Sequence, residues 1–154
     1  MPLKPSEITE PVQALLAHHD HMTVTLEAWH NSLVDIRVLQ ERHEGDLYAR
    51  EILLLRQRDG EPVQLGLMQI NLAGLPEIVR LEIQSQALPL GRIMIRHHLL
   101  REVELVQLWR VKLSEQMRLK LNVAADTVTY ARTARIQVDG APVVELLEII
   151  VPQK

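Results

Sequence analysis

The chain has 154 residues, of which 47% are hydrophobic and 24% charged, and its formal net charge is −3. This length suits a single domain over residues 1–154, and the composition is that of a globular protein. No apolar run approaches the length of a membrane span, so no membrane partner is expected. The basic residues are scattered among acids and form no phosphate-binding stripe, so nucleic acid is not an expected partner either.

The first residues lack the continuous hydrophobic stretch of a secretory signal, which makes a cytoplasmic location the expectation. The absence of cysteine excludes disulfides, thiolate metal sites and a thiol nucleophile. The chain has no phenylalanine and only two tryptophans and two tyrosines, so it lacks the aromatic platforms of single-strand nucleic-acid binders.

Alternation of apolar and polar residues predicts six strands along the chain. Two Asp-Gly pairs, at 59–60 and 139–140, are strong hairpin signals because both positions tolerate a positive φ. The strands are expected over residues 32–42, 47–58, 62–71, 99–113, 127–138 and 141–151.

Helical spacing predicts short helices before and between these strands, over 11–19, over 23–30 and from Pro76 onward. The segment Leu88-Pro-Leu-Gly91 interrupts the third helix. Residues 114–122 fit either a helix or a continuing strand. The predicted class is therefore α+β, with a six-stranded antiparallel sheet and short flanking helices.

Arg50 and Glu148 are charged residues on the apolar faces of two predicted strands. Their period-2 neighbours are Tyr48, Ile52 and Leu54 for the first, and Val144, Leu146 and Ile150 for the second. Burying an ion without a partner is very costly. The two side chains therefore either pair with each other or face a polar ligand enclosed by the protein.

Histidine pairs and triplets are the obvious candidates for metal ligands, but their spacing is unfavourable. The four consecutive residues His18-His-Asp-His21 do not easily converge on one ion, and cationic histidines favour a helix end. His97 and His98 point to opposite sides of an extended chain. No glycine-rich phosphate loop, nucleophile elbow or paired-carboxylate signature is present, so no metal and no cofactor are expected.

Two helix boundaries offer backbone N–H groups that can receive an anion. One lies in Leu88-Pro-Leu-Gly-Arg92, for which a simple helix break is the alternative interpretation. The other is Met22-Thr23, for which a core methionine beside a helix cap is the alternative.

Several short segments, in a shared order, resemble the chorismate lyase family, the chorismate pyruvate-lyases. They are Asp20-His-Met-Thr23, Leu26-Glu27, Ala49-Arg-Glu-Ile-Leu-Leu54, Asp59-Gly-Glu-Pro62, Pro89-Leu-Gly-Arg92, Leu100-Arg-Glu102, Gly140-Ala-Pro142 and Glu148-Ile-Ile-Val-Pro152. The resemblance implies a six-stranded antiparallel sheet with an enclosed pocket under helical flaps.

The resemblance also implies an enzyme that cleaves chorismate to 4-hydroxybenzoate and pyruvate, a step of ubiquinone biosynthesis. Arg50 would hold the ring carboxylate, assisted by the backbone amides of Met22 and Leu90. Glu148 would contact the ring hydroxyl, as a hydrogen-bond acceptor or as a general base. The expected partner is thus chorismate or a similar aromatic or enolpyruvyl acid, with Arg50 and Glu148 as catalytic residues.

The chain departs from the family in places. The connection between Met22 and Arg50 is short, residues 63–70 share little with the lyases, and Ala141 replaces an expected lysine. The same fold serves as the small-molecule sensing domain, known as UTRA, of some GntR-type regulators, and a non-catalytic domain of that kind is the alternative function. Against it stands the expectation that no basic DNA-binding module precedes the first motif. A third possibility is an ordinary buried ion pair between Arg50 and Glu148; the oligomeric state stays open.

Overall fold

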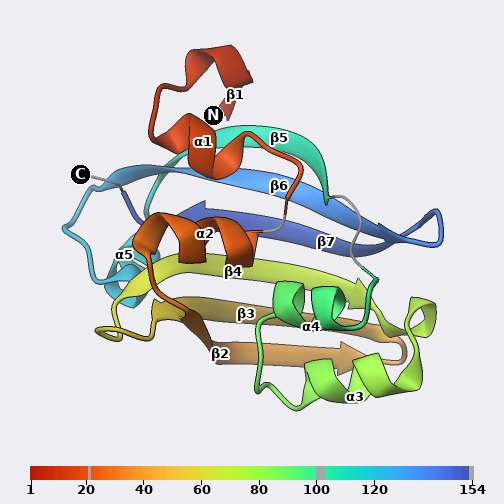
Figure 1. Ribbon diagram of the computed structural model, residues 1–154. Helices are drawn as coiled ribbons and strands as arrows, with labels where there is room; N and C mark the ends of the chain where they lie inside the picture. Colours follow the sequence, from red (N-terminus) through yellow and green to blue (C-terminus); the bar gives the residue numbers. More distant parts are fainter. Residues whose placement is uncertain (21, 100–102, 153–154) are drawn as a thin grey trace.

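One antiparallel sheet of seven strands runs through the computed structural model, which describes residues 1–20, 22–99 and 103–152 (Figure 1). The strand order is β1-β5-β6-β7-β4-β3-β2. The strands are β1 (Pro2–Leu3), β2 (Val34–Glu44), β3 (Leu47–Arg56), β4 (Pro62–Asn71), β5 (Val103–Lys112), β6 (Val128–Val138) and β7 (Ala141–Ile150). The predicted α+β class with an antiparallel sheet is confirmed. The predicted count of six strands is wrong, because β1 has two residues and no period to recognise.

Four short helices cover one face of the sheet in Figure 1, and a fifth packs on the opposite face. The helices are α1 (Val12–Leu16), α2 (Met22–His30), α3 (Glu77–Gln84), α4 (Leu90–Arg96) and α5 (Glu115–Leu121), with two 3-10 turns at Pro5–Glu7 and Leu72–Gly74. No helix among the described residues is long and apolar enough to cross a membrane.

Local chemistry explains where the helices begin. Pro76 and Pro89 occupy the N-cap positions of α3 and α4, so the predicted interruption near Leu88 is the boundary between two helices. The ambiguous segment 114–122 is the helix α5. The Ser114 hydroxyl caps it by accepting a hydrogen bond from the Met117 N–H, and Asn122 ends it at a φ of 57°.

Both predicted Asp-Gly hairpins are present. Gly60 has a φ of +73° between β3 and β4, and Gly140 a φ of +79° between β6 and β7. These turns set the register that aligns side chains across the sheet.

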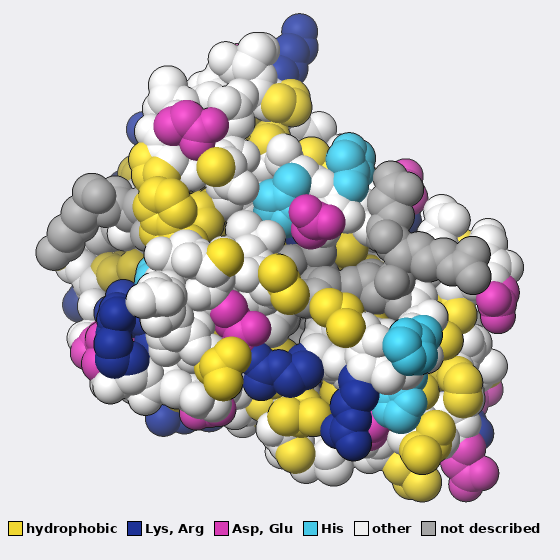
Figure 2. Space-filling view, in the orientation of Figure 1, with side chains coloured by type: hydrophobic (Ala, Val, Ile, Leu, Met, Phe, Trp, Pro, Cys, Tyr) yellow, Lys and Arg dark blue, Asp and Glu magenta, His cyan; other side chains and the backbone are white. Residues whose placement is uncertain are grey.

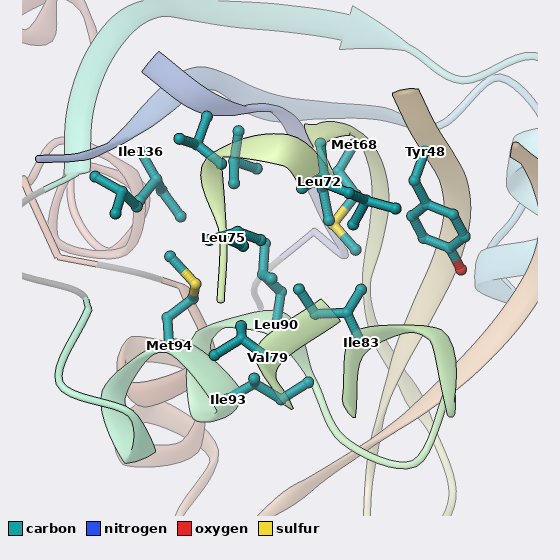
Figure 3. Close-up of a cluster of buried hydrophobic side chains, with 14 of the residues drawn as sticks. Tyr48, Met68, Leu72, Leu75, Val79, Ile83, Leu90, Ile93, Met94 and Ile136 are labelled. Atoms are coloured by element: carbon teal, nitrogen blue, oxygen red, sulfur yellow. The ribbon is translucent and has the colours of Figure 1, made fainter. Parts of the chain in front are cut away.

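Most of the core lies between the sheet and helices α1 to α4, and a further cluster that includes Leu121 of α5 packs on the opposite face. Figure 3 shows Leu90, Ile93 and Met94 of α4 with Val79 and Ile83 of α3, gathered against the sheet residues Tyr48, Met68 and Ile136. A second cluster buries Leu15 and Leu16 of α1 and Met22 and Leu26 of α2. The helices therefore form a roof over this face of the sheet.

Candidate ligand-binding site

Strand register places Arg50 and Glu148 on the same, helix-covered face. Arg50 of β3 lies opposite Met68 of β4, while Gly66 of β4 lies opposite both Ile52 and Glu148. Glu148 is thus two strands away from Arg50 and one row further along the sheet. The standard spacings put their backbones about 10 Å apart across the strands and about 7 Å along them.

All four side chains singled out from the sequence line one cavity beneath α2 and α4. Arg50 and Glu148 come from the sheet, Met22 begins α2 and Leu90 begins α4. The cavity volume is about 40 Å³. The remaining wall includes Ile52, Leu54, Gln64, Gly66, Met68 and Leu146.

The Arg50 guanidinium is buried and only partly satisfied. The side chain is 3% exposed, and its Nη1 donates to the carbonyl of Ile83 at 3.0 Å. Nε and Nη2 have no hydrogen-bond partner among the described residues. These two nitrogens share one edge of the guanidinium plane, so their N–H bonds form the parallel fork that matches a carboxylate. Burial lowers the pKa of Arg50, but an arginine stays charged in proteins.

Glu41 lies opposite Arg50 on β2, and its carboxylate is engaged elsewhere. Its Oε2 accepts hydrogen bonds from the Tyr48 hydroxyl at 2.7 Å and from the Gln86 amide at 2.6 Å. These two bonds lower the pKa of Glu41, while burial and then the bond to Glu41 raise the pKa of Tyr48. The Tyr48 ring lies 6.0 Å from the Arg50 guanidinium carbon, at the edge of the cation–π range.

Glu148 pairs with Arg132, a residue that the sequence analysis missed. Arg132 of β6 is 0% exposed and lies directly opposite Glu148 in the sheet. Its Nε donates to Glu148 Oε1 at 2.9 Å, Nη1 to the His18 carbonyl at 3.1 Å, and Nη2 to the Asp20 carbonyl at 2.8 Å. A signal for it existed, because its period-2 neighbours Tyr130, Ala134 and Ile136 repeat the pattern that singled out Arg50.

Arg50 and Glu148 therefore do not form an ion pair with each other. A buried ion pair is present, but its cation is Arg132. Arg50 lines the same cavity, and two of its nitrogens have no partner within residues 1–20, 22–99 and 103–152. This arrangement differs from the third possibility above, in which Arg50 and Glu148 satisfy each other.

His18, in the segment after α1, forms hydrogen bonds with backbone groups. His18 Nε2 donates to the Leu15 carbonyl at 2.7 Å, and its Nδ1 accepts from the Asp20 N–H at 3.1 Å. Burial, and then the positive charge of Arg132, lower the pKa of His18. Within the described ranges, no group of three or more potential ligands is arranged for a metal. His21 and the family-like segment 100–102 lie outside the described residues.

Ion pairs connect the helices of the roof. Glu27 of α2 pairs with Arg92 of α4, and Glu27 Oε2 also accepts from the Val34 N–H at 2.9 Å. Glu82 of α3 pairs with Arg96 of α4 at 2.7 Å, and its Oε2 lies at hydrogen-bond distance, 2.5 Å, from Nε2 of His97. Figure 2 shows this face with acidic, basic and hydrophobic side chains interspersed.

A larger groove of about 580 Å³ is lined in part by the opposite face of the sheet, through Glu51, Leu67, Gln69, Glu145 and Leu147 among others. Arg50 also borders this groove, but Glu51 and Glu145 on the opposite face have partners, because Lys120 pairs with Glu51 at 2.7 Å and Arg135 with Glu145 at 3.7 Å. The smaller cavity is the better candidate site, since its polar groups are buried and include unpaired ones.

No protein-family model matches the chain, and no curated protein matches it. Solved structures do share its fold. The effector domain of PhnF from Mycobacterium smegmatis has a TM-score of 0.66 and 11% identity over 85% of this chain and 88% of that domain. The ligand-binding domain of a Bordetella bronchiseptica regulator assigned to the GntR family has a TM-score of 0.59 and 13% identity, over 78% and 86%. A GntR-family regulator from Bacillus cereus has a TM-score of 0.55 and 11% identity, over 77% and 92%.

These similarities correct the predicted enzymatic activity. The expectation of a chorismate pyruvate-lyase is wrong, because the similar structures from Bordetella bronchiseptica and Bacillus cereus are of GntR-family transcription regulators and no sequence match supports a lyase. Chorismate as substrate and ubiquinone biosynthesis are likewise not supported. The residues alone did not reveal this, because a buried arginine and a glutamate that line one cavity can bind an acid in a sensor as well as in an enzyme. The fold shared by chorismate lyases and UTRA domains stands.

Proposed function

We propose that this domain is a non-catalytic sensor that binds a small organic anion in the cavity beneath α2 and α4. One observation carries the proposal: Arg50 is buried, and both nitrogens of one guanidinium edge lack a partner in the part of the chain that the structure describes. Buried unsatisfied donors are costly, and a carboxylate would satisfy both at once through two parallel hydrogen bonds. The fold likeness to an effector domain supports sensing as the role of such a site.

The other cavity residues have distinct parts in this proposal. Glu148, held by Arg132, presents a carboxylate that accepts a hydrogen bond from a polar group of the ligand. Met22 and Leu90 lie in the first turns of α2 and α4, where backbone N–H groups have no intrahelical acceptor. Their side chains supply apolar wall.

Ligand entry requires the roof to move. The cavity of about 40 Å³ is far smaller than the roughly 150 Å³ of an engineered cavity that holds benzene. The sheet is braced by its ladders, so the yielding parts are α2 and α4, which are joined by the Glu27–Arg92 pair. Binding would therefore shift the balance between two positions of these helices, which is how occupancy becomes a signal.

The test is isothermal titration of the protein with small carboxylic acids, comparing the wild type with Arg50→Lys. Lysine keeps the positive charge but cannot form the parallel fork, so affinity should fall about 10- to 100-fold, the equivalent of one lost charge-assisted hydrogen bond. Unchanged affinity in Arg50→Lys would remove Arg50 from the site. Failure of every small carboxylate to bind the wild type would refute the proposed function itself.

A further inference from the structure

A second buried polar group without a partner lines the cavity. Gln64 of β4 is 3% exposed, and its Oε1 has no hydrogen-bond partner among the described residues. An amide oxygen in a protein interior normally has a donor, and leaving it without one is costly. Gln64 also lies in the segment 63–70, which shares little with the chorismate lyases, so the family resemblance does not account for it.

Gln64 and Arg50 lie at opposite ends of the cavity floor. Gln64 pairs with Leu54 and Ile150, whereas Arg50 pairs with Met68, four residues further along β4. This offset corresponds to roughly 13 Å between the two rows of the sheet. Glu148 stands in the row between them, opposite Gly66.

Gly66 lies on β4 between the rows of Gln64 and Arg50, and its lack of a side chain matters for packing. A Cβ built at this position would lie 3.2 Å from Ile52 Cγ1 and 3.5 Å from Gln64 Nε2. Glycine weakens a strand interior and often marks a place where a ligand comes close to the backbone. The absence of a side chain at Gly66 therefore lets Ile52 and the Gln64 amide pack close to the backbone, beside Glu148.

We infer that Gln64 determines specificity at this site, by accepting a hydrogen bond from a hydroxyl or amino group of the ligand. The inference rests on the proposed function and names the ligand class: a small carboxylic acid that carries a hydrogen-bond donor at the end away from its carboxylate. The cavity then matches its ligand at both ends. The free fork of Arg50 donates to the acid, and Gln64 Oε1, with the carboxylate of Glu148, accepts from the donor.

The experiment titrates the protein with matched acids that differ in one donor group. Benzoate is compared with 4-hydroxybenzoate and 4-aminobenzoate, and hexanoate with 6-hydroxyhexanoate. The wild type should bind the donor-bearing member of a pair more tightly. Gln64→Met, which keeps the length and shape of the side chain, should reduce that preference about 3- to 10-fold and leave the affinity for the plain acid unchanged.

Gln69→Met is the matched control, because Gln69 lies on the same strand but is exposed. It should leave the preference as in the wild type. Thermal unfolding without ligand gives a second readout. Replacing an unsatisfied buried amide by methionine should keep or raise Tm, whereas a glutamine with a structural hydrogen bond would lower Tm when replaced.

The outcomes separate the two claims. If acids bind the wild type but Gln64→Met keeps the full preference, or if it lowers Tm sharply, the role of Gln64 is refuted and the sensor proposal stands. If none of the five acids binds the wild type, the proposed function fails and the inference fails with it.

Discussion

Arg132 and Arg50 are two buried arginines on the same face of one sheet, and they differ in how completely their nitrogens are satisfied. Every nitrogen of Arg132 donates to an oxygen within 3.1 Å, from Glu148, His18 and Asp20. Arg50 donates from one nitrogen to the Ile83 carbonyl, and its other two nitrogens have no partner among the residues that the structure describes. Residue type and burial are alike in the two regions, so the proposal of a binding site at Arg50 rests on the difference in unpaired donors.

The largest effect is expected from Arg132→Met. The change leaves Glu148 as an uncompensated buried charge and removes the donors to the His18 and Asp20 carbonyls. Breaking a buried ion pair in this way should lower the free energy of unfolding by about 3–5 kcal/mol, as measured by urea denaturation.

Arg135→Met is the control for this prediction. Arg135 lies on the same strand with a side chain 43% exposed, and its Nε is 3.7 Å from Glu145. Its replacement should cost no more than about 1 kcal/mol, as for other surface pairs. A similar decrease in the free energy of unfolding for both variants would show that the buried Arg132–Glu148 pair stabilises the fold no more than a surface pair.

A smaller effect on stability is expected from Arg50→Met. The variant loses one hydrogen bond to Ile83 but also removes a buried charge with two unsatisfied donors. These contributions oppose each other, so the free energy of unfolding should change by less than about 1 kcal/mol, while carboxylate binding is lost. Destabilisation as large as that of Arg132→Met would show that Arg50 stabilises the fold as Arg132 does.

The smallest effect concerns pH and sharpens the description of the Arg132 region. Burial, and then Arg132, lower the pKa of His18 below its unfolded value near 6.5, so the unfolded chain binds more protons than the folded one below that pH. The contribution of His18 to the free energy of unfolding is therefore fully present above about pH 6.5 and declines as the pH falls toward the folded pKa.

His18→Gln should make the loss of stability between pH 7 and pH 5 shallower, as followed by urea denaturation at each pH. The pKa of His30 is also lowered by burial, so some dependence of the same sign should remain. Parallel pH profiles for the variant and the wild type would show that His18 does not titrate with folding.

Signals that act over a few residues were readable in the sequence. The Asp-Gly turns and the alternation along 62–71 anticipated the hairpins and the bounds of β4, Pro62–Asn71. Strand parity also identified the face of Arg50 and Glu148, because side-chain direction in a strand depends only on position. The same rule identifies Arg132, whose period-2 neighbours on β6 are also apolar.

Other features have no local signal. Strand β1 exists because two residues pair with Trp109 and Leu108 on β5, a contact that spans most of the chain. Residues 114–122 became a helix through the Ser114 cap and packing against β4. Propensity left residues 114–122 undecided, and no strand was expected at Pro2–Leu3.

The sequence by itself determined the fold class, the hairpins and the presence of charged residues on an apolar face, because periodicity and turn chemistry are local. Only the tertiary structure decided which cation neutralises Glu148, and that two Arg50 nitrogens at the cavity beneath α2 and α4 have no partner among the described residues. Those facts depend on neighbours from β3, β4, β6, β7, α2 and α4, whose mutual distances are set by strand register and helix packing. Whether a buried charge is satisfied is a property of that whole arrangement, which no single segment contains.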